Sequence, residues 1–117
     1  MTFDDVRQLM ADLPGVEEST SYGTPSLKVK GKFLTRIRPE TNEGDGDSLV
    51  VTGVGFDERE MLMEAEPETF HITPHYKDYP SVLARLGTVD PGTVRNFLER
   101  RWRAVAPKAF LKKHDAR

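Results

Sequence analysis

The stretch LKVKGKFLTRI, residues 27–37, decides the fold class of this chain. Hydrophobic and polar side chains alternate on either side of its single glycine, which is the two-residue period of a β-strand. A glycine between two such runs is typical of a tight turn, so the stretch predicts a hairpin of two antiparallel strands. The sheet that contains this hairpin is expected to be antiparallel.

The register of the hairpin depends on the length of its loop. A three-residue loop at residues 30–32 places Val29 opposite Phe33 and Leu27 opposite Thr35, which gathers the hydrophobic side chains on one face. A two-residue loop would pair Val29 with a lysine and mix the two faces. The sequence therefore favours the three-residue loop, with basic side chains on the outer face of the hairpin.

Helices are expected before and after the hairpin. Thr2 can cap a first helix, with Asp5 completing a capping box, and Pro14 ends that helix. Asp90 is followed by a proline and can cap a last helix, which ends before Pro107. These signals predict two helices that enclose the rest of the chain.

The other elements follow from similar patterns. Strands are expected at residues 16–22, 49–54, 69–72 and 82–86, and a turn at 23–25 follows the first of them. A helix capped by Asp57 is expected at residues 57–65. The resulting order, α-β-β-β-β-α-β-β-α, indicates an α+β domain in which helices pack on an antiparallel sheet. We expect one domain over residues 1–107, a basic tail at residues 108–117 and a flexible connection at residues 42–47.

Composition limits the possible functions. The 117 residues include no cysteine, which excludes disulfides, thiolate catalysis and cysteine-bound zinc. No carboxylate dyad, catalytic triad or dinucleotide motif emerges, so we expect no catalytic residue and no cofactor. The acidic N-terminus does not resemble a signal peptide, and no hydrophobic run reaches the roughly 20 residues of a membrane span. We therefore expect a cytoplasmic protein without a membrane partner.

Charge is distributed unevenly along the chain. Residues 94–117 contain eight Lys/Arg and two Asp/Glu, a net charge of +6, whereas residues 1–93 contain nine Lys/Arg and seventeen Asp/Glu, a net charge of −8. A basic segment on an acidic domain predicts an anionic partner, which is either the rest of the chain or a nucleic acid. Because the whole chain has a net charge of −2, binding to DNA is expected to be weak and strongly salt-dependent.

Two groups of cations are candidate contacts for phosphate. The first lies on the outer face and tip of the hairpin and comprises Lys28, Lys30, Lys32, Arg36 and Arg38. The second lies in the tail and comprises Lys108, Lys112 and Lys113. Each phosphate that such a cation neutralises releases counterions and favours binding. The alternative is that the hairpin cations only solubilise an exposed sheet face and that the tail is disordered.

The last helix is expected to be mainly a packing element. Its hydrophobic stripe comprises Val94, Phe97, Leu98, Trp102 and Val105. Arg101 falls inside this stripe when residues are placed 100° apart around the helix. A charge in that position needs a carboxylate or a backbone carbonyl as its partner, or must extend its head to water.

A loop at residues 74–80 concentrates aromatic side chains. His71 and His75 are four residues apart, which would suit a metal on a helix, but Pro74 lies between them and opposes a helix. We therefore expect no metal site. The alternative is a small-ligand or enzymatic pocket, or a surface that stacks on an exposed base. Such a site would comprise Tyr22, His75, Tyr76 and Tyr79, unless these rings only pack the loop against the domain.

Several short segments together resemble the MmcQ/YjbR family. They are LPGVEE at residues 13–18, YGTP at 22–25, VKGKF at 29–33, PETF at 67–70, TPHY at 73–76 with the Tyr79-Pro80 pair, and APK at 106–108 after Trp102-Arg103. The resemblance implies a small bacterial α+β protein whose fold is similar to a DNA-binding fold with two wing-like hairpins. It implies DNA binding but no catalytic residue. Ser81 stands where relatives often have an aromatic residue, so stacking at that position is not implied.

The sequence therefore predicts a non-enzymatic nucleic-acid-binding protein, a monomer or homodimer, with DNA as the candidate partner. Two alternatives stay open, namely the pocket around His75 and a protein-interaction role in which the tail docks on an acidic partner. A concave surface around His75 would favour the pocket. A continuous basic surface formed by hairpin and tail would favour nucleic acid.

Overall fold

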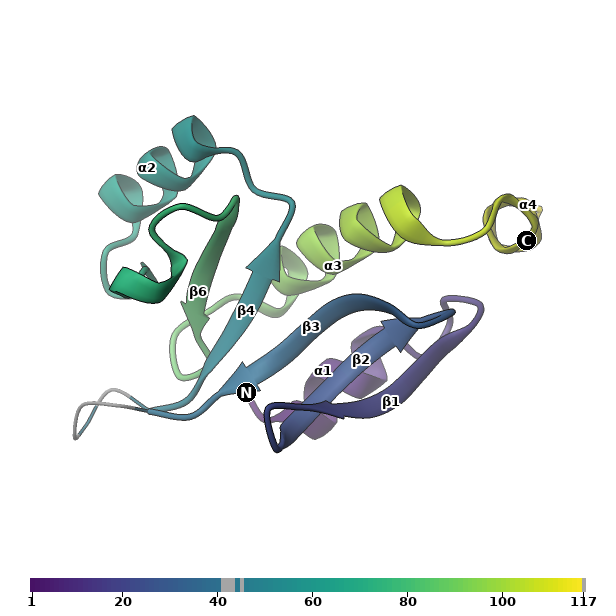
Figure 1. The fold of residues 1–117 in the computed structure, drawn as a ribbon, viewed down its shortest axis with the longest axis horizontal. Coiled ribbons are helices and arrows are strands. Elements are labelled where there is room, and N and C mark those ends of the chain that lie inside the picture. Colours follow the sequence, from purple (N-terminus) through teal and green to yellow (C-terminus); the bar gives the residue numbers. More distant parts are fainter. Residues whose placement is uncertain (41–43, 45, 117) are drawn as a thin grey trace.

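The computed structural model describes residues 1–40, 44 and 46–116, which form a six-stranded antiparallel sheet with helices (Figure 1). In chain order the elements are α1 (Phe3–Leu9), β1 (Val16–Ser21), β2 (Thr24–Val29), β3 (Lys32–Arg38), β4 (Ser48–Thr52), α2 (Phe56–Ala65), β5 (Phe70–His71), the 3₁₀ helix η1 (Pro74–Tyr76), β6 (Ser81–Arg85), α3 (Pro91–Val105) and α4 (Lys108–Asp115). The predicted α+β class and order are confirmed, and α4 is an addition. Part of the predicted connection at residues 42–47 lies outside the described residues. No helix in the described part of the chain is long and apolar enough to cross a membrane.

The sheet is divided near its middle. The strands follow the order β1-β2-β3-β4-β6-β5, and every neighbouring pair is antiparallel. β3 pairs with β4 only through Ile37–Leu49 and Arg38–Ser48. Beyond these pairs the two strands diverge, so the sheet opens into a V between them (Figure 1).

Hydrophobic side chains cover both faces of the sheet. On one face the strands pack with α1 and α3 in the main core, and Figure 1 shows α1 behind β2. Along β4, Leu49 and Val51 belong to this core, whereas Val50 between them belongs to a second cluster. That cluster joins Val50 to Leu83 and to Tyr76 of η1. Alternation along the strand thus gives the sheet a second face on which a site can form.

The predicted three-residue loop of the central hairpin is wrong. Lys30-Gly31 forms a two-residue turn with φ angles of 49° and 76°, and Val29 pairs with Lys32. Positive φ at both central positions is the type I′ geometry, whose twist matches that of the strands. A bulge in β3, where Leu34 is the extra residue, then shifts the register, so that Leu27 pairs with Thr35 as predicted.

Two of the three predicted helix caps are confirmed. Thr2 and Asp5 form the capping box of α1, and Asp90 caps α3. The predicted cap at Asp57 is wrong, because α2 begins one residue earlier and no side chain in the described residues caps it. α1 is also shorter than predicted, since its helical hydrogen bonds end at Leu9 and turns continue the chain.

α3 packs on the sheet through its hydrophobic stripe. Trp102 is fully buried, and its indole N–H donates to the Pro14 carbonyl at 3.0 Å. Arg101 is half-buried, and its Nε donates to the Phe33 carbonyl at 3.2 Å. The expected backbone partner of this cation is therefore confirmed.

The segment predicted as a free or disordered tail instead forms helix α4. Arg103 of α3 pairs with Asp115 of α4 at 2.9 Å, and Trp102 makes an edge-to-face contact with His114. The Arg103 guanidinium holds the pKa of the Asp115 carboxyl below its ordinary value. These contacts attach the basic segment to the rest of the domain.

Replacing Gly15 by alanine is expected to weaken the docking of α4. Gly15 has a φ of +76°, and a Cβ at this position would overlap Cε2 of Phe110 in α4. The variant combines backbone strain with a steric clash, so we expect the free energy of unfolding to fall by about 2–3 kcal/mol. Urea denaturation measures this loss.

Gly31→Ala is the matched control for Gly15→Ala. Gly31 has the same φ of +76°, but nothing lies within 4 Å of its added Cβ. The free energy of unfolding of this variant should therefore fall only by the cost of backbone strain, about 1 kcal/mol. Equal losses in the two variants would show that Phe110 moves aside without cost and that the contact does not hold α4.

Candidate functional site

A cavity of about 420 Å³ lies on the second face of the sheet. It brings together all four aromatic residues of the predicted pocket, Tyr22, His75, Tyr76 and Tyr79. Its other lining residues are Phe33, Arg36, Val50, Thr52, Gly53, Pro80, Ser81 and Arg101. The volume falls within the range of about 300–1,000 Å³ that is typical of small-molecule sites. We call this site the aromatic cavity.

The divided sheet gives the aromatic cavity its shape. Phe33 on β3 and Val50 on β4 lie on either side of the opening, and the turn after β1 contributes Tyr22. Arg101 belongs to α3, which packs on the other face, yet it borders the cavity and approaches Gly53. Its Nε donates to the carbonyl of Phe33, in the part of β3 that is not paired with β4.

Arg59 of α2 holds the loop that forms the aromatic wall of the cavity. Its buried guanidinium donates to the carbonyls of Tyr76, Lys77, Tyr79 and Ser81 at 2.9–3.2 Å. Four carbonyl dipoles from one loop thus stabilise one buried cation. Arg59 is therefore a positioning residue for the wall. Its role could not be predicted from the sequence, because nothing in the pattern of α2 marks this arginine as buried.

Arg36 is the buried cation of the cavity. It is 8% exposed, and it donates to the Tyr76 hydroxyl at 2.8 Å and to the Ile37 carbonyl at 3.1 Å. The ring of Tyr22 lies over its guanidinium, 4.9 Å from the ring centroid. The prediction that Arg36 stands on an exposed outer face is therefore wrong, since Tyr22 and Tyr76 cover this part of β3.

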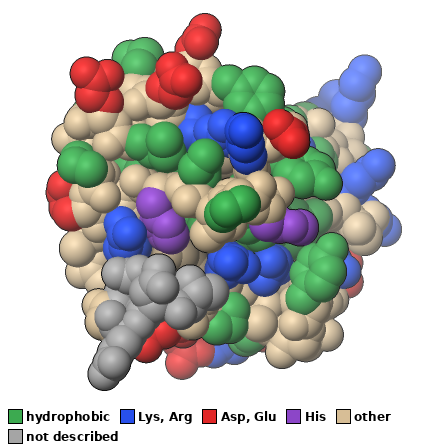
Figure 2. Space-filling view, turned by 60° about the vertical axis from the view of Figure 1, so that its left-hand side comes forward, with side chains coloured by type: hydrophobic (Ala, Val, Ile, Leu, Met, Phe, Trp, Pro, Cys, Tyr) green, Lys and Arg blue, Asp and Glu red, His purple; other side chains and the backbone are tan. Residues whose placement is uncertain are grey.

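The lining of the cavity contains cations and no carboxylate. Arg36 and Arg101 both border it, and none of the lining residues is Asp or Glu. Arg36 forms no ion pair within the described residues, and Thr52 has a hydroxyl without a hydrogen-bond partner there. Figure 2 shows blue cations, purple histidines and green hydrophobic groups on this side of the molecule, with most red carboxylates toward its edges. A buried cation without a counterion favours a ligand that carries oxygen acceptors.

Tyr22 occupies a strained position beside the cavity. Tyr22-Gly23 forms a two-residue turn with φ angles of 54° and 76°, so the predicted turn at residues 23–25 is displaced and β2 begins at Thr24. Asparagine and glycine are favoured at the first position of such a turn, and an aromatic residue there costs roughly 1 kcal/mol. The side chain of Tyr22 is nevertheless 89% exposed. Strain of this kind is concentrated at functional sites.

Tyr22→Asn is expected to raise the free energy of unfolding by about 0.5–1 kcal/mol, because asparagine tolerates positive φ. Lys30→Asn is the matched control, since Lys30 has a φ of 49° at the same position of the other turn and lies outside the cavity. Urea denaturation should show a similar gain in both variants. A loss in Tyr22→Asn alone would mean that packing of the ring on Arg36 outweighs the strain.

His71 and His75 do not form one site. His75 lines the aromatic cavity, whereas Nε2 of His71 lies 3.0 Å from Oγ of Ser48. Among the described residues, no group of three or more His, Cys, Asp or Glu side chains could hold a metal ion.

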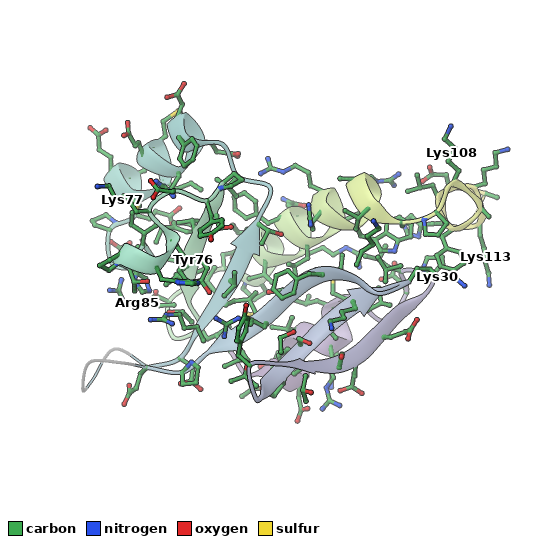
Figure 3. All side chains as sticks on the ribbon, viewed as in Figure 1. Lys30, Tyr76, Lys77, Arg85, Lys108 and Lys113 are labelled. Atoms are coloured by element: carbon green, nitrogen blue, oxygen red, sulfur yellow. The ribbon has the colours of Figure 1, made fainter. Side chains whose placement is uncertain are left out.

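The hairpin tip and α4 form a second candidate surface at one end of the molecule. Nζ of Lys30 lies 5.7 Å from the ring centroid of Phe110 in α4. Figure 3 shows Lys30 with Lys108 and Lys113 around α4, whereas Lys77 lies near the other end of the long axis. We call this surface the basic end, which comprises Lys30, Lys32, Lys108, Lys112 and Lys113. All five are exposed, and none forms an ion pair within the described part of the chain.

The predicted row of hairpin cations is therefore not continuous. Lys28 lies opposite Glu17 of β1 in the register of the sheet, so an acidic residue neighbours this cation. Arg38 lies 5.8 Å from the ring centroid of Tyr76, on the side of the aromatic cavity. The two lysines at the tip, Lys30 and Lys32, lie apart from Arg36 and Arg38 and belong with the lysines of α4 to the basic end.

A second hollow of about 490 Å³ lies between α1 and the segment that connects β6 to α3. Aliphatic side chains such as Leu9, Leu86 and Val89 line it, and its single carboxylate, Asp5, already caps α1. It has no aromatic ring and no Lys or Arg among its lining residues. The aromatic cavity is the stronger candidate for a binding site. Aromatic rings and two arginines line it, although its volume is smaller.

These features define a small α+β domain with a divided antiparallel sheet, an aromatic cavity and a basic end. The YjbR family matches residues 11–104, and the chain belongs to this family, as the sequence resemblance implied. Uncharacterized proteins of Mycobacterium bovis and Mycobacterium tuberculosis are each 28% identical to it over 123 residues, which cover 94% of this chain and 92% of the relative. No solved structure matches the chain.

Proposed function

We propose that this protein binds nucleic acid without catalysing a reaction, and that the basic end contacts the phosphate backbone. The observation that best supports this proposal is the contact between the hairpin tip and α4, at Lys30 and Phe110. It joins two groups of lysines that are far apart in the sequence (Figure 3). A local basic surface is the electrostatic requirement for phosphate binding, whatever the charge of the whole chain.

The lysines of the basic end are available for phosphate, whereas three arginines of α3 are not. The paired arginines are Arg95 with Asp12, Arg100 with Glu58 and Arg103 with Asp115. Hydrogen bonds from Arg95 hold the pKa of Asp12 below its ordinary value, so this pair is kept when the solution becomes moderately acidic. Much of the positive charge of α3 is therefore neutralised within the chain. The excess is concentrated in α4 and the hairpin tip.

Fluorescence anisotropy with labelled duplex DNA, at low and moderate salt, tests this proposal. The Lys30→Glu/Lys113→Glu variant should bind at least about tenfold more weakly at low salt. The slope of log affinity against log salt should become shallower by about two, because each lost phosphate contact removes about one released counterion.

Lys77→Glu is the control for these charge reversals. It changes the net charge by the same amount per substitution, but Lys77 lies near the other end of the molecule (Figure 3). This variant should retain most of the affinity. Equal weakening by Lys77→Glu, or no binding of the unchanged protein at low salt, would overturn the proposal.

A small-ligand or enzymatic site in the aromatic cavity is the second candidate function. Its support is the concave surface around His75, with Arg36 and Arg101 beside it. A ligand that binds only the native state would raise Tm by mass action. Thermal unfolding in the presence of anionic aromatic metabolites would test this candidate, and a Tyr79→Ala variant should lose the gain in Tm.

A further inference from the structure

We infer that the aromatic cavity takes an unpaired nucleobase of a single-stranded nucleic acid, while the basic end holds neighbouring phosphates. The inference rests on the proposed nucleic-acid binding and specifies the form of nucleic acid that is preferred. Three features support it, namely exposed ring faces, donors without partners, and the proximity of the cavity to the basic end.

Exposed ring faces are the first feature. Tyr22 and Tyr79 are 89% and 55% exposed, although both line a cavity of the domain. The ring of His75 lies 5.9 Å from that of Tyr79, with an angle of 36° between the planes. Every nucleobase has a π face, so aromatic platforms bind unpaired bases with little dependence on sequence. A simple inorganic anion has no π face, so it would not stack on these rings.

Donors without partners are the second feature. The Arg101 guanidinium makes one hydrogen bond within the described residues, from Nε to the Phe33 carbonyl. Arg36 has no carboxylate partner there, and the Thr52 hydroxyl is unpaired. Guanidinium and hydroxyl groups donate to the carbonyl oxygens of bases and to phosphate oxygens. The cavity therefore offers both ring faces and donors to a nucleotide.

Proximity to the basic end is the third feature. Lys32 belongs to the basic end, and its neighbour on β3, Phe33, lines the aromatic cavity. The two side chains point to opposite faces of the sheet, because successive residues of a strand alternate, but their backbone positions are only about 3.3 Å apart. A nucleic-acid strand that places one base in the cavity would therefore bring its next phosphates onto the lysines by passing around the start of β3.

Duplex DNA cannot use the cavity in the same way. A base inside a duplex is stacked and paired, so it must be extruded before it can enter a pocket, which costs free energy. Duplex DNA would then contact the basic end alone. A single strand would contact both surfaces and should bind more tightly at equal length and salt.

Fluorescence anisotropy with a labelled single-stranded oligonucleotide and with its duplex tests the inference. The single strand should bind at least about fivefold more tightly than the duplex, because base stacking on an aromatic side chain adds to the phosphate contacts. Tyr79→Ala should weaken binding of the single strand by roughly 5- to 100-fold and leave duplex binding unchanged. Tyr79→Phe should restore the affinity, since it keeps the ring and removes only the hydroxyl.

Met61→Ala is the control for a lost exposed side chain, since Met61 is 69% exposed and lies outside the cavity. Adenosine and thymidine monophosphate are added as competitors to distinguish a free nucleotide from a strand. Weak competition by these monophosphates, in the unchanged protein but not in Tyr79→Ala, supports the inference. Tight binding of a monophosphate with no binding of the oligonucleotide would overturn the single strand as the occupant.

Failure of the inference can be distinguished from failure of the proposed function. If duplex and single strand bind equally and Tyr79→Ala has no effect, the inference is overturned while phosphate binding by the basic end stands. If neither form binds at low salt, the proposed function fails and the inference fails with it.

Discussion

Replacing Arg59 by alanine should lower the free energy of unfolding by about 3–4 kcal/mol. The guanidinium of Arg59 is buried and satisfies four carbonyls of the loop at residues 76–81. Alanine would remove one donor from each of these carbonyls in a partly buried loop, although those of Tyr76 and Tyr79 also accept from backbone N–H groups, and each group that loses its pairing carries a desolvation cost. Urea denaturation monitored by circular dichroism measures the loss.

Arg100→Ala is the matched control for this variant. Arg100 is exposed and pairs with Glu58 at 3.0 Å, so its removal should cost less than about 1 kcal/mol. Arg59→Lys should fall between the two, because one ammonium cannot reproduce the planar fork that serves four carbonyls. A loss in Arg59→Ala no larger than that in Arg100→Ala would show that water satisfies the loop carbonyls and that Arg59 does not hold the wall.

Periodicity predicted the strands of this sheet but not the division between them. The alternation in residues 27–37 located β2 and β3 correctly, because a two-residue period is a local property of a strand. The type I′ turn at Lys30-Gly31 was missed, since a bulge in β3 corrects the register that this turn would otherwise disturb. The limited pairing of β3 with β4 depends on long-range packing, which a local pattern does not contain.

The candidate site was predicted in part. Tyr22, His75, Tyr76 and Tyr79 share one cavity, although Tyr22 lies more than 50 residues before the others in the chain. The contribution of Arg101 was not predicted, yet its position inside a hydrophobic stripe was a signal that it needed a special partner. The burial of Arg36 left no such signal, because it depends on rings that come from two distant segments.

The structure also shows where the positive charge of the C-terminal segment lies. Phe110 and Leu111 stand among the lysines of the last segment, and both pack against the main core. This hydrophobic pair was the available signal that residues 108–115 form a docked helix. Docking of α4 places its lysines beside the hairpin tip. The excess of positive charge in the C-terminal sequence is therefore part of one surface, the basic end.

Arg36→Met should weaken binding of the oligonucleotide without lowering the free energy of unfolding. Burial of a guanidinium without a carboxylate is costly, and Arg36 is 8% exposed with no ion pair in the described residues. Methionine can fill the space beneath Tyr22 without a charge. We expect the free energy of unfolding to stay constant or to rise by about 1 kcal/mol. Affinity for the single-stranded oligonucleotide should fall by at least about tenfold, because a charge-assisted hydrogen bond to the ligand is lost.

Arg36→Lys is the control that keeps the charge. It should retain an intermediate affinity, since an ammonium attracts an anion but lacks the geometry of the planar fork. Urea denaturation with and without the oligonucleotide measures both quantities, because a ligand that binds the native state stabilises it by mass action. If Arg36→Met instead loses about 2 kcal/mol of stability and binds the oligonucleotide unchanged, Arg36 is a structural residue that supports Tyr76. If both expectations hold, the protein retains a costly buried cation because that cation binds the ligand.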